Sequence, residues 1–319
     1  MSILEAIIQG IVQGLTEFLP VSSSGHLAIS QHIMGVNDSN LFFNVMLHIG
    51  TLLAVVIVYY KLIGRLFTAL VKMIKSIVTG KYKWNKMDED QNLVIMLVVG
   101  LIPLFLLFLP LPFAHGLTAK DLAEIWSGKS GYLIVVGISL IVTSVLLTLG
   151  NFANKITERE YKAKGIVKKI GGGRYHLNVI DALSIGVAQM FAAIFPGISR
   201  SGSTLAVGEL RGINKQKALD YTFVLGIPSI LAAALLEGKE AAEAGHITGD
   251  MVLPVIFGVV VSAVVGFVAI LLFKWMLRKD RMYIFAIYTA VGGIIIVVIS
   301  CIELNCGVNI FTGESLVFV

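Results

Sequence analysis

The stretch Phe195-Pro-Gly-Ile-Ser-Arg-Ser-Gly202 decides the fold, because it breaks an apolar segment, residues 177–217, that is otherwise long enough to cross a lipid bilayer. Pro and Gly end a helix, and the charged guanidinium of Arg200 is costly against lipid. The break therefore predicts that this segment turns back as a re-entrant helical hairpin. Residues 1–41 are broken in the same way at Leu19-Pro-Val-Ser-Ser-Ser-Gly-His26, which predicts a second hairpin.

The composition of the whole chain is that of a membrane protein. Of 319 residues, 56% are hydrophobic and only 14% are charged, and the mean hydropathy is +0.87. Soluble domains have about 45–50% apolar and about 25% charged residues. We therefore expect a single membrane domain over residues 1–319 and exclude a soluble enzyme. The 32 Gly, 7 Pro and 2 Cys residues also exclude collagen-like, disordered and disulfide-rich classes.

Six further apolar runs are long enough to cross about 30 Å of hydrocarbon as helices. They predict an all-α polytopic protein whose six transmembrane helices are Phe42–Tyr60, Leu93–Phe113, Gly131–Leu149, Ala218–Leu236, Met251–Phe273 and Tyr283–Cys301. Just after the first run, polar residues recur at helical spacing among apolar ones. This pattern predicts a separate amphipathic helix over Lys61–Ile77 on the inner membrane surface.

Lys and Arg gather in three of the connecting segments, and the positive-inside rule places such segments in the cytoplasm. These segments are 61–92, 151–176 and 274–281. The other connections and the C-terminal tail have few or no basic residues, so we expect them outside, together with the N-terminus. On this count residues 177–217 enter from the cytoplasm and leave again, while residues 1–41 form a hairpin that enters from outside. The net charge of +5 then indicates anionic membrane lipids as partners and no nucleic acid.

The two hairpins resemble each other in sequence. Aligning Pro20 with Pro196 brings together two further identical pairs, Gln13 with Gln189 and Ser23 with Ser199. Broken helices at corresponding places in two oppositely oriented halves are typical of an inverted-topology repeat. We expect a first repeat over residues 1–150 and a second over 177–319, joined by a basic cytoplasmic loop, 151–176. The alternative is that apolar helices share such identities by chance.

Irregular backbone at membrane depth is tolerated only where protein or a wet cavity satisfies its polar groups. The two breaks should therefore meet around a site.

Four polar side chains recur at every fourth position of the first apolar segment: Glu5, Gln9, Gln13 and Glu17. They share one helix face, which cannot be turned toward lipid. For Glu5 and Gln9 we favour a structural role as hydrogen-bonding groups between helices. A carboxylate near the bilayer centre costs about 2.5–3.5 kcal/mol and is a functional hypothesis by default. We therefore take Glu17 as a site residue.

Hydroxyl side chains follow both breaks, where the next helix should begin. The first break has Ser22, Ser23, Ser24 and His26, and the second has Ser199, Arg200, Ser201 and Thr204. Helix N-termini bind anions through their free N–H groups, and an Arg supplies two parallel donors suited to phosphate. Two such N-termini with an Arg, a His and a Glu predict an oxyanion site with acid–base capacity, which phosphoryl transfer needs.

Several of these residues also have a simpler explanation. Ser22 or Ser24 can serve only as a helix cap. Arg200 can merely neutralise Glu17, and His26 taken alone can be a core histidine. Another class of function is also open, because broken helices in inverted repeats are typical of transporters. A polyprenyl-phosphate transporter or flippase with a midplane phosphate site is therefore the alternative to an enzyme.

The stretches Gln13-Gly-Leu-Thr-Glu-Phe-Leu-Pro-Val-Ser-Ser-Ser-Gly-His26 and Pro196-Gly-Ile-Ser-Arg-Ser-Gly-Ser-Thr204 closely resemble the two signature motifs of the undecaprenyl-diphosphate phosphatases, the bacitracin-resistance family. The resemblance extends over nearly the whole chain. It implies a multi-pass enzyme of the bacterial inner membrane that removes one phosphate from undecaprenyl diphosphate or a related polyprenyl diphosphate. This reaction recycles the lipid carrier of cell-wall synthesis and confers bacitracin resistance. The resemblance also implies a divalent cation, and Mg²⁺ or Ca²⁺ suits one carboxylate and several phosphate oxygens.

The resemblance also implies roles for single residues. Arg200 would clamp the diphosphate, and Glu17 would hold the metal or steer His26. We take Ser23 as the nucleophile, with His26 as its base and later as the acid for the leaving group; direct attack by an activated water is the alternative. The remaining candidates would bind the substrate: Gln13, Ser22, Ser24, Ser199, Ser201 and Thr204. The site should open to the outer side, and the sequence does not decide between a monomer and a homodimer.

Overall fold

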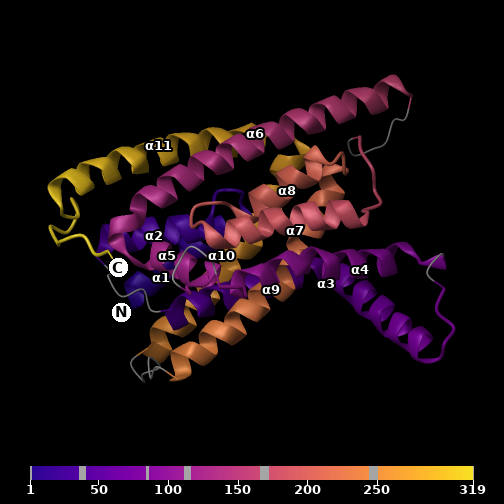
Figure 1. The fold of residues 1–319 in the computed structure, drawn as a ribbon, viewed down its shortest axis with the longest axis horizontal. Helices are drawn as coiled ribbons and strands as arrows, with labels where there is room; N and C mark the ends of the chain where they lie inside the picture. The colour runs from indigo at the N-terminus through magenta and orange to yellow at the C-terminus, as the bar shows by residue number, and fades with distance from the viewer. Residues whose placement is uncertain are drawn as a thin grey trace.

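The computed structural model describes residues 2–35, 41–83, 86–110, 116–165, 172–243 and 251–318. Within these ranges every regular element is a helix, and strand-like pairing is limited to isolated bridges (Figure 1). The predicted all-α class is therefore confirmed.

Within the described ranges, six helices are long and apolar enough to cross a membrane, which confirms the six predicted spans. They are α3 (Leu41–Val78), α4 with its 3-10 continuation η2 (Glu89–Leu101 and Ile102–Phe108), α6 (Leu133–Ala163), α9 (Lys215–Glu243), α10 (Val252–Arg278) and α11 (Tyr283–Cys306). A chain segment in hydrocarbon must pair its own N–H and C=O groups, and a helix does so within one segment. The chain is thus a multi-pass membrane protein.

Two helices extend further than the hydropathy pattern predicted. Helix α3 continues from the first span through the whole of Lys61–Ile77, so the amphipathic segment is not a separate helix. Helix α6 continues to Ala163, so the first half of the predicted loop 151–176 is helical. Lys, Glu and Arg are good helix formers. Loss of apolar character therefore marks where a helix leaves the lipid, and not where the helix ends.

Four shorter helices form two helical hairpins. The first joins α1 (Ile3–Phe18) to α2 (Ser23–Met34), and the second joins α7 (Val179–Ile194) to α8 (Arg200–Leu210). Both breaks fall at the Pro-containing stretches that the sequence indicated, since Pro lacks the N–H that a helix interior uses and disfavours continuation of the helix. The Nε2 of Gln31 in α2 donates to Gln9 in α1 over 3.1 Å, which is the interhelical role expected for Gln9.

The open end of the second hairpin is closed by ion pairs. Asp181 at the start of α7 is fully buried and accepts two hydrogen bonds of 3.0 Å from the guanidinium of Arg174. Arg211, directly after α8, donates its Nε to the same carboxylate over 2.9 Å. Removing these partners would leave the buried carboxylate of Asp181 without its charge-assisted hydrogen bonds, which destabilises a fold. The cluster therefore holds the two ends of the hairpin together.

Small residues allow the hairpins and spans to pack closely. A Cβ on Gly14 of α1 would lie 2.8 Å from the carbonyl oxygen of Ser262 in α10. Helices α6 and α11 approach in the same way, because a Cβ on Gly293 would lie 2.8 Å from the carbonyl oxygen of Gly137. Such contacts are typical of helix pairs in membranes, where van der Waals packing drives association.

The two ends of the molecule differ in what they carry. Figure 1 shows both termini at one end, near α2 and α5 (Ala119–Gly128). The C-terminal ends of α3 and α6 and the N-terminal ends of α4 and α7 lie at the other. The described parts of the predicted outward connections and of the predicted cytoplasmic connections thus lie at opposite ends of the molecule.

Candidate active site

The breaks in the two hairpins lie against each other, as expected. Oγ of Ser201, in the first turn of α8, donates to the carbonyl oxygen of Leu19 in the first break over 3.2 Å. A Cβ on Gly25 would lie only 2.9 Å from the Cα of Gly197 in the second break. The N-termini of α2 and α8 therefore meet at one place, and glycine is required where the two backbones touch.

Both helix N-termini use the same cap. Oγ of Ser22 accepts from the N–H of Gly25 over 3.2 Å and lies 3.3 Å from Oγ of Ser24. In α8 the contacts match. Oγ of Ser199 accepts from the N–H of Gly202 over 3.0 Å and lies 3.3 Å from Oγ of Ser201. Ser22 thus has the capping role that was the simpler of its two explanations.

This shared cap corrects the predicted alignment of the hairpins. Ser22 corresponds to Ser199, so Ser23 corresponds to Arg200 and not to Ser199. The second break has one more residue between its Pro and its cap than the first, and this residue shifts the register. Ser23 and Arg200 are therefore both the first residue of their helices.

The carboxylate of Glu17 is the point on which these two residues converge. Its side chain is 2% exposed, near the C-terminal end of α1. Oγ of Ser23 donates to Oε2 of Glu17 over 2.6 Å, and Nη2 of Arg200 donates to Oε1. Gln13 donates its Nε2 over 2.9 Å from one turn earlier. A buried carboxylate with these partners remains ionised and holds Ser23 and Arg200 in fixed positions.

Arg200 pairs with Glu17 but is not enclosed by it. Its side chain is 28% exposed, and Nη2 is the atom that meets the carboxylate. Gly226 of α9 faces the guanidinium, since a Cβ there would lie 3.8 Å from Cζ. A guanidinium has five N–H donors, so the ion pair leaves others for a second anion. The pair with Glu17 is thus compatible with anion binding by the same side chain.

His26 does not contact Ser23. Its Nδ1 lies 2.8 Å from the carbonyl oxygen of Ser22, and its Nε2 lies 2.8 Å from the hydroxyl of Tyr288 in α11. The prediction that His26 is the base for Ser23 has no supporting contact among the described residues, because the Ser23 hydroxyl already has an acceptor in Glu17. The prediction that Glu17 steers His26 also finds no supporting contact among the described residues.

The hydroxyls of the second break differ in availability. Oγ1 of Thr204 donates to the carbonyl oxygen of Arg200 over 2.7 Å, as Ser and Thr hydroxyls inside helices often do. The hydroxyl of Thr204 is thus engaged with its own helix, and its contact with phosphate stays a prediction. Ser199 serves as the cap, and its N–H donates to Oγ1 of Thr143 in α6 over 3.0 Å.

Three residues near the site were not among the predicted site residues. His48 of α3 holds its Nε2 3.6 Å from Oε2 of Glu17, while its Nδ1 lies 2.8 Å from the carbonyl oxygen of Asn44. Thr143 braces the second break, and Tyr288 contacts His26. His48 is nevertheless marked by the sequence as a supporting candidate, because a His inside an apolar span is unusual. Thr143 and Tyr288 carry no such signal, because both are ordinary residues of spanning helices.

A divalent cation fits the donors present in the site. Oε1 of Gln13 is buried and has no hydrogen-bond partner among the described residues, one helical turn from the carboxylate of Glu17. No three His, Cys, Asp or Glu side chains gather into a metal site in that part of the chain. Mg²⁺ needs no such cluster, because it is often bound by one carboxylate, waters and substrate phosphates.

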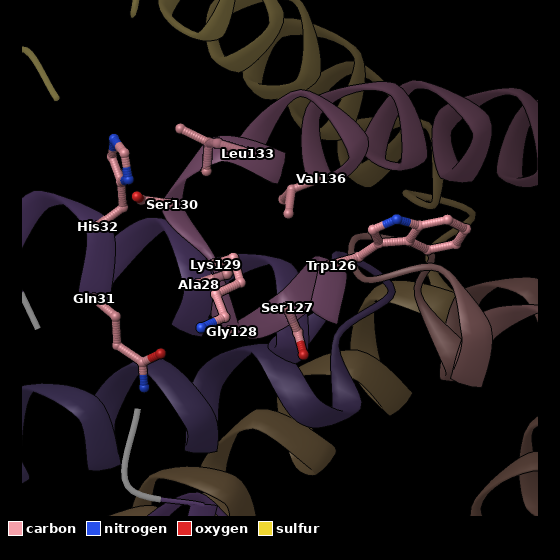
Figure 2. A pocket seen from close by; sticks show the side chains of 10 residues that line it. All are labelled: Ala28, Gln31, His32, Trp126, Ser127, Gly128, Lys129, Ser130, Leu133 and Val136. Atoms are coloured by element: carbon pink, nitrogen blue, oxygen red, sulfur yellow. The ribbon is translucent and has the colours of Figure 1, made fainter. Parts of the chain in front are cut away.

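A cavity lies beside the junction of the two breaks. Figure 2 shows it between α2, α5 and the start of α6, with Gln31, His32, Trp126 and Lys129 among its walls. Val136 lines its inner end and also touches the junction, because a Cβ on Gly197 would lie 2.5 Å from the Val136 carbonyl oxygen. Neither Glu17 nor Arg200 lines this cavity, so it is separate from the site described above.

Comparison with known proteins identifies the family of the chain. The family model described as "Bacitracin resistance protein BacA" matches residues 6–295. The chain belongs to the BacA family. A relative from Alkaliphilus metalliredigens, named undecaprenyl-diphosphatase, is 37% identical over 303 residues, which are 94% of this chain and 99% of the relative. Another, from Bacteroides fragilis and with the same name, is 34% identical over 308 residues, covering 95% of this chain and 100% of the relative. The BacA match includes both hairpins and the whole of the site.

Proposed function

We propose that this BacA-family chain hydrolyses undecaprenyl diphosphate to undecaprenyl phosphate and inorganic phosphate. Relatives that bear the name undecaprenyl-diphosphatase align with it over nearly their whole length. The observation that carries the proposal is the convergence of Ser23 and Arg200 on Glu17, where two helix N-termini meet. Bacitracin resistance and a place in cell-wall synthesis follow from this reaction, since it regenerates the lipid carrier.

The diphosphate binds at the junction of the two breaks. The N-termini of α2 and α8 point N–H groups at this place, and helix dipoles favour negative charge there. The N–H donors of Arg200 that do not contact Glu17 hold the phosphate oxygens bidentately. Ser24 and Ser201 add hydroxyls on either side. The isoprenoid chain remains in the surrounding lipid.

Ser23 is the nucleophile of the first step. Its Oγ attacks the terminal phosphorus while its proton passes to Oε2 of Glu17, which already accepts it over 2.6 Å. The Oγ–P bond forms as the bond from phosphorus to the bridging oxygen breaks. The electron pair of that bond leaves with undecaprenyl phosphate, and Arg200 stabilises the charge on the transferred group.

Water completes the reaction in the second step. It attacks the phosphoserine and gives a proton to His26, which stands at the first turn of α2. The Oγ–P bond breaks, Ser23 recovers its proton from Glu17, His26 passes the proton of the water to solvent, and inorganic phosphate is released. If water attacks the substrate directly, His26 has the same role and Ser23 only binds phosphate.

A divalent cation belongs to the proposed site. Glu17 and Oε1 of Gln13 would hold it, and it would supply positive charge against the phosphate oxygens. We propose Mg²⁺ or Ca²⁺ because both ions prefer oxygen donors, and the donors of this site are oxygens.

The placement of the site in the membrane is also part of the proposal. The two hairpins are re-entrant, the halves 1–150 and 177–319 form an inverted repeat, and the site opens to the outer face of the bacterial inner membrane. The separation of the termini from the basic connections supports this orientation (Figure 1).

Release of inorganic phosphate from undecaprenyl diphosphate by the purified chain in detergent tests the function. We expect phosphate to appear in proportion to enzyme, and Glu17→Gln to reduce the rate by about 10²-fold or more, since it removes the acceptor for the Ser23 proton. Binding of the lipid without phosphate release would instead favour the transporter alternative.

A further inference from the structure

The cavity between α2, α5 and the start of α6 has no part in the reaction proposed above. Its volume, counted as the space open to the centres of water-sized groups, is about 30 Å³. On this measure one water needs about 10–15 Å³. The cavity therefore has room for a small group of a few oxygens but not for an isoprenoid chain. It lies at the same end of the molecule as the two termini (Figure 1).

Two side chains bring unused polar atoms to the wall of this cavity (Figure 2). The side chain of His32 is 4% exposed, and its Nε2 donates to Oε1 of Glu303 over 2.8 Å. Its Nδ1 has no hydrogen-bond partner among the described residues. Nε2 of Gln31 donates to Gln9 and to Asn44 over 3.1 Å each, so both of its hydrogens are used. Oε1 of Gln31 is therefore an acceptor that needs a donor.

The same wall also provides donors. The ammonium of Lys129 forms no ion pair among the described residues. Oγ of Ser130 accepts from the N–H of Val317 over 2.9 Å, which leaves the hydrogen of the hydroxyl available. A ligand that satisfies this wall must carry negative charge and also a hydrogen of its own.

We propose that the cavity is a second phosphate site, which holds the inorganic phosphate released at the junction before it reaches the outside. The inference rests on the proposed function, which supplies this phosphate. Val136 lines the cavity and also borders the junction, because a Cβ on Gly25 would lie 3.2 Å from its Cγ1. A released phosphate therefore meets this cavity beside the place where it forms.

Inorganic phosphate has both kinds of oxygen that the wall requires. Its P–O–H group donates to Oε1 of Gln31, and its anionic oxygens accept from Lys129 and Ser130. Nδ1 of His32 accepts in the neutral ring and donates in the charged ring, and phosphate satisfies it in both states. The phosphodiester of a membrane lipid has no P–O–H group, so it lacks the donor.

Calorimetry with inorganic phosphate tests the site without hydrolysis. The full-length chain in detergent carries Arg200→Lys, which weakens the phosphate contacts of the junction. In this background we expect Lys129→Gln to weaken phosphate binding by about tenfold or more, because a charge-assisted hydrogen bond is lost. Lys81→Gln is the control, since Lys81 is exposed and does not line the cavity. Equal phosphate affinity in Lys129→Gln and in the control would overturn the inference.

Two further ligands distinguish phosphate from other anions and from lipid. Sulfate has no hydrogen at neutral pH to offer Gln31, so we expect it to bind at least about tenfold more weakly than phosphate. Equal affinity for sulfate would mean that Lys129 merely attracts anions and would overturn the assignment. Phosphatidylglycerol added to the detergent should leave phosphate binding unchanged. Loss of phosphate binding would instead assign the cavity to a lipid headgroup.

Product inhibition gives a readout in an enzyme with an intact junction. With undecaprenyl diphosphate as substrate, Lys129→Gln should keep kcat/KM within about twofold of the wild type, because kcat/KM does not include product release. Non-competitive inhibition by added inorganic phosphate should weaken by about tenfold, as the binding does. Unchanged inhibition would contradict the inference. A wild-type chain that released no phosphate would reject the proposed function, while calorimetry would still decide whether the cavity binds phosphate.

Discussion

Glu17 organises the site because residues of both hairpins donate to its carboxylate. The first residue of α2, Ser23, and the first residue of α8, Arg200, each donate to one of its oxygens. A buried carboxylate cannot be left without donors, so the fold itself requires these contacts. In the proposed function, the same contacts align the nucleophile Ser23 with the guanidinium that binds phosphate.

Replacing Arg200 with Lys tests whether the guanidinium acts on the substrate and not only on Glu17. Lys retains the charge that neutralises Glu17 but lacks the planar pair of donors. We expect Arg200→Lys to fold and to lose activity by about 10²-fold or more, measured as phosphate release. The exposed Arg159 provides the control, and Arg159→Lys should be unchanged. Near wild-type turnover of Arg200→Lys would assign Arg200 to charge neutralisation alone.

The sequence predicts which residues belong to the site better than it predicts which of those residues contact one another. Glu17, Ser23 and Arg200 stand out because a charge or a hydroxyl cluster beside Pro is costly in an apolar segment. The partner of Ser23 could not be predicted. The second break is one residue longer than the first, so Ser23 and Arg200 take equivalent positions and both donate to Glu17. Tyr288 could not be found either, since its contact depends on the packing of α11 against the rest of the chain.

The two hairpins act as one element because their breaks touch. Gly25 is the third residue of α2, and its missing Cβ leaves room for the backbone of Gly197. A helical Gly normally costs about 1 kcal/mol relative to Ala. A side chain at this position would push the two N-termini apart, so glycine is needed there despite its low helix propensity.

Gly25→Ala therefore gives opposite expectations for the isolated helix and for the site. Helix propensity alone predicts a small gain in stability. The Cβ 2.9 Å from the Cα of Gly197 instead predicts displaced hairpins and a loss of kcat/KM of about tenfold or more, since misplacement by about 1 Å can cost 10²-fold. Gly64→Ala in α3 is the control, because a Cβ there meets nothing within 4 Å. Equal kcat/KM in both variants and in the wild type would contradict the close approach of the two breaks.

The spanning helices were predictable from hydropathy, whereas the ends of the helices that extend beyond the apolar runs were not. All six spans follow from hydropathy, because hydrocarbon demands both length and apolar character. The extension of α6 to Ala163 was missed, since a fall in hydropathy shows where an apolar run ends and does not show where the helix ends. For the same reason Lys61–Ile77 was expected as a separate helix, whereas it continues α3 without a break.

At the scale of the whole molecule, the proposed topology places the termini and the basic connections on opposite sides of the membrane. A reporter fused after Val319 should be active outside, and one inserted near Lys164 should be active in the cytoplasm. Fusion activity in intact cells provides the measurement. A cytoplasmic C-terminus would remove the argument that residues 177–217 turn back within the membrane.

The central claim is that Ser23 attacks phosphorus at the junction of the two hairpins, and trapping the phosphoserine tests it most directly. Substrate labelled in its terminal phosphate is mixed with the full-length enzyme, quenched early with acid and digested. We expect label on the peptide that contains Ser23, and none from Ser23→Ala, which should still bind substrate through Arg200. An enzyme that carries no label at any time, together with a Ser23→Ala variant that keeps more than about a tenth of the rate, would contradict the claim and show that water attacks directly.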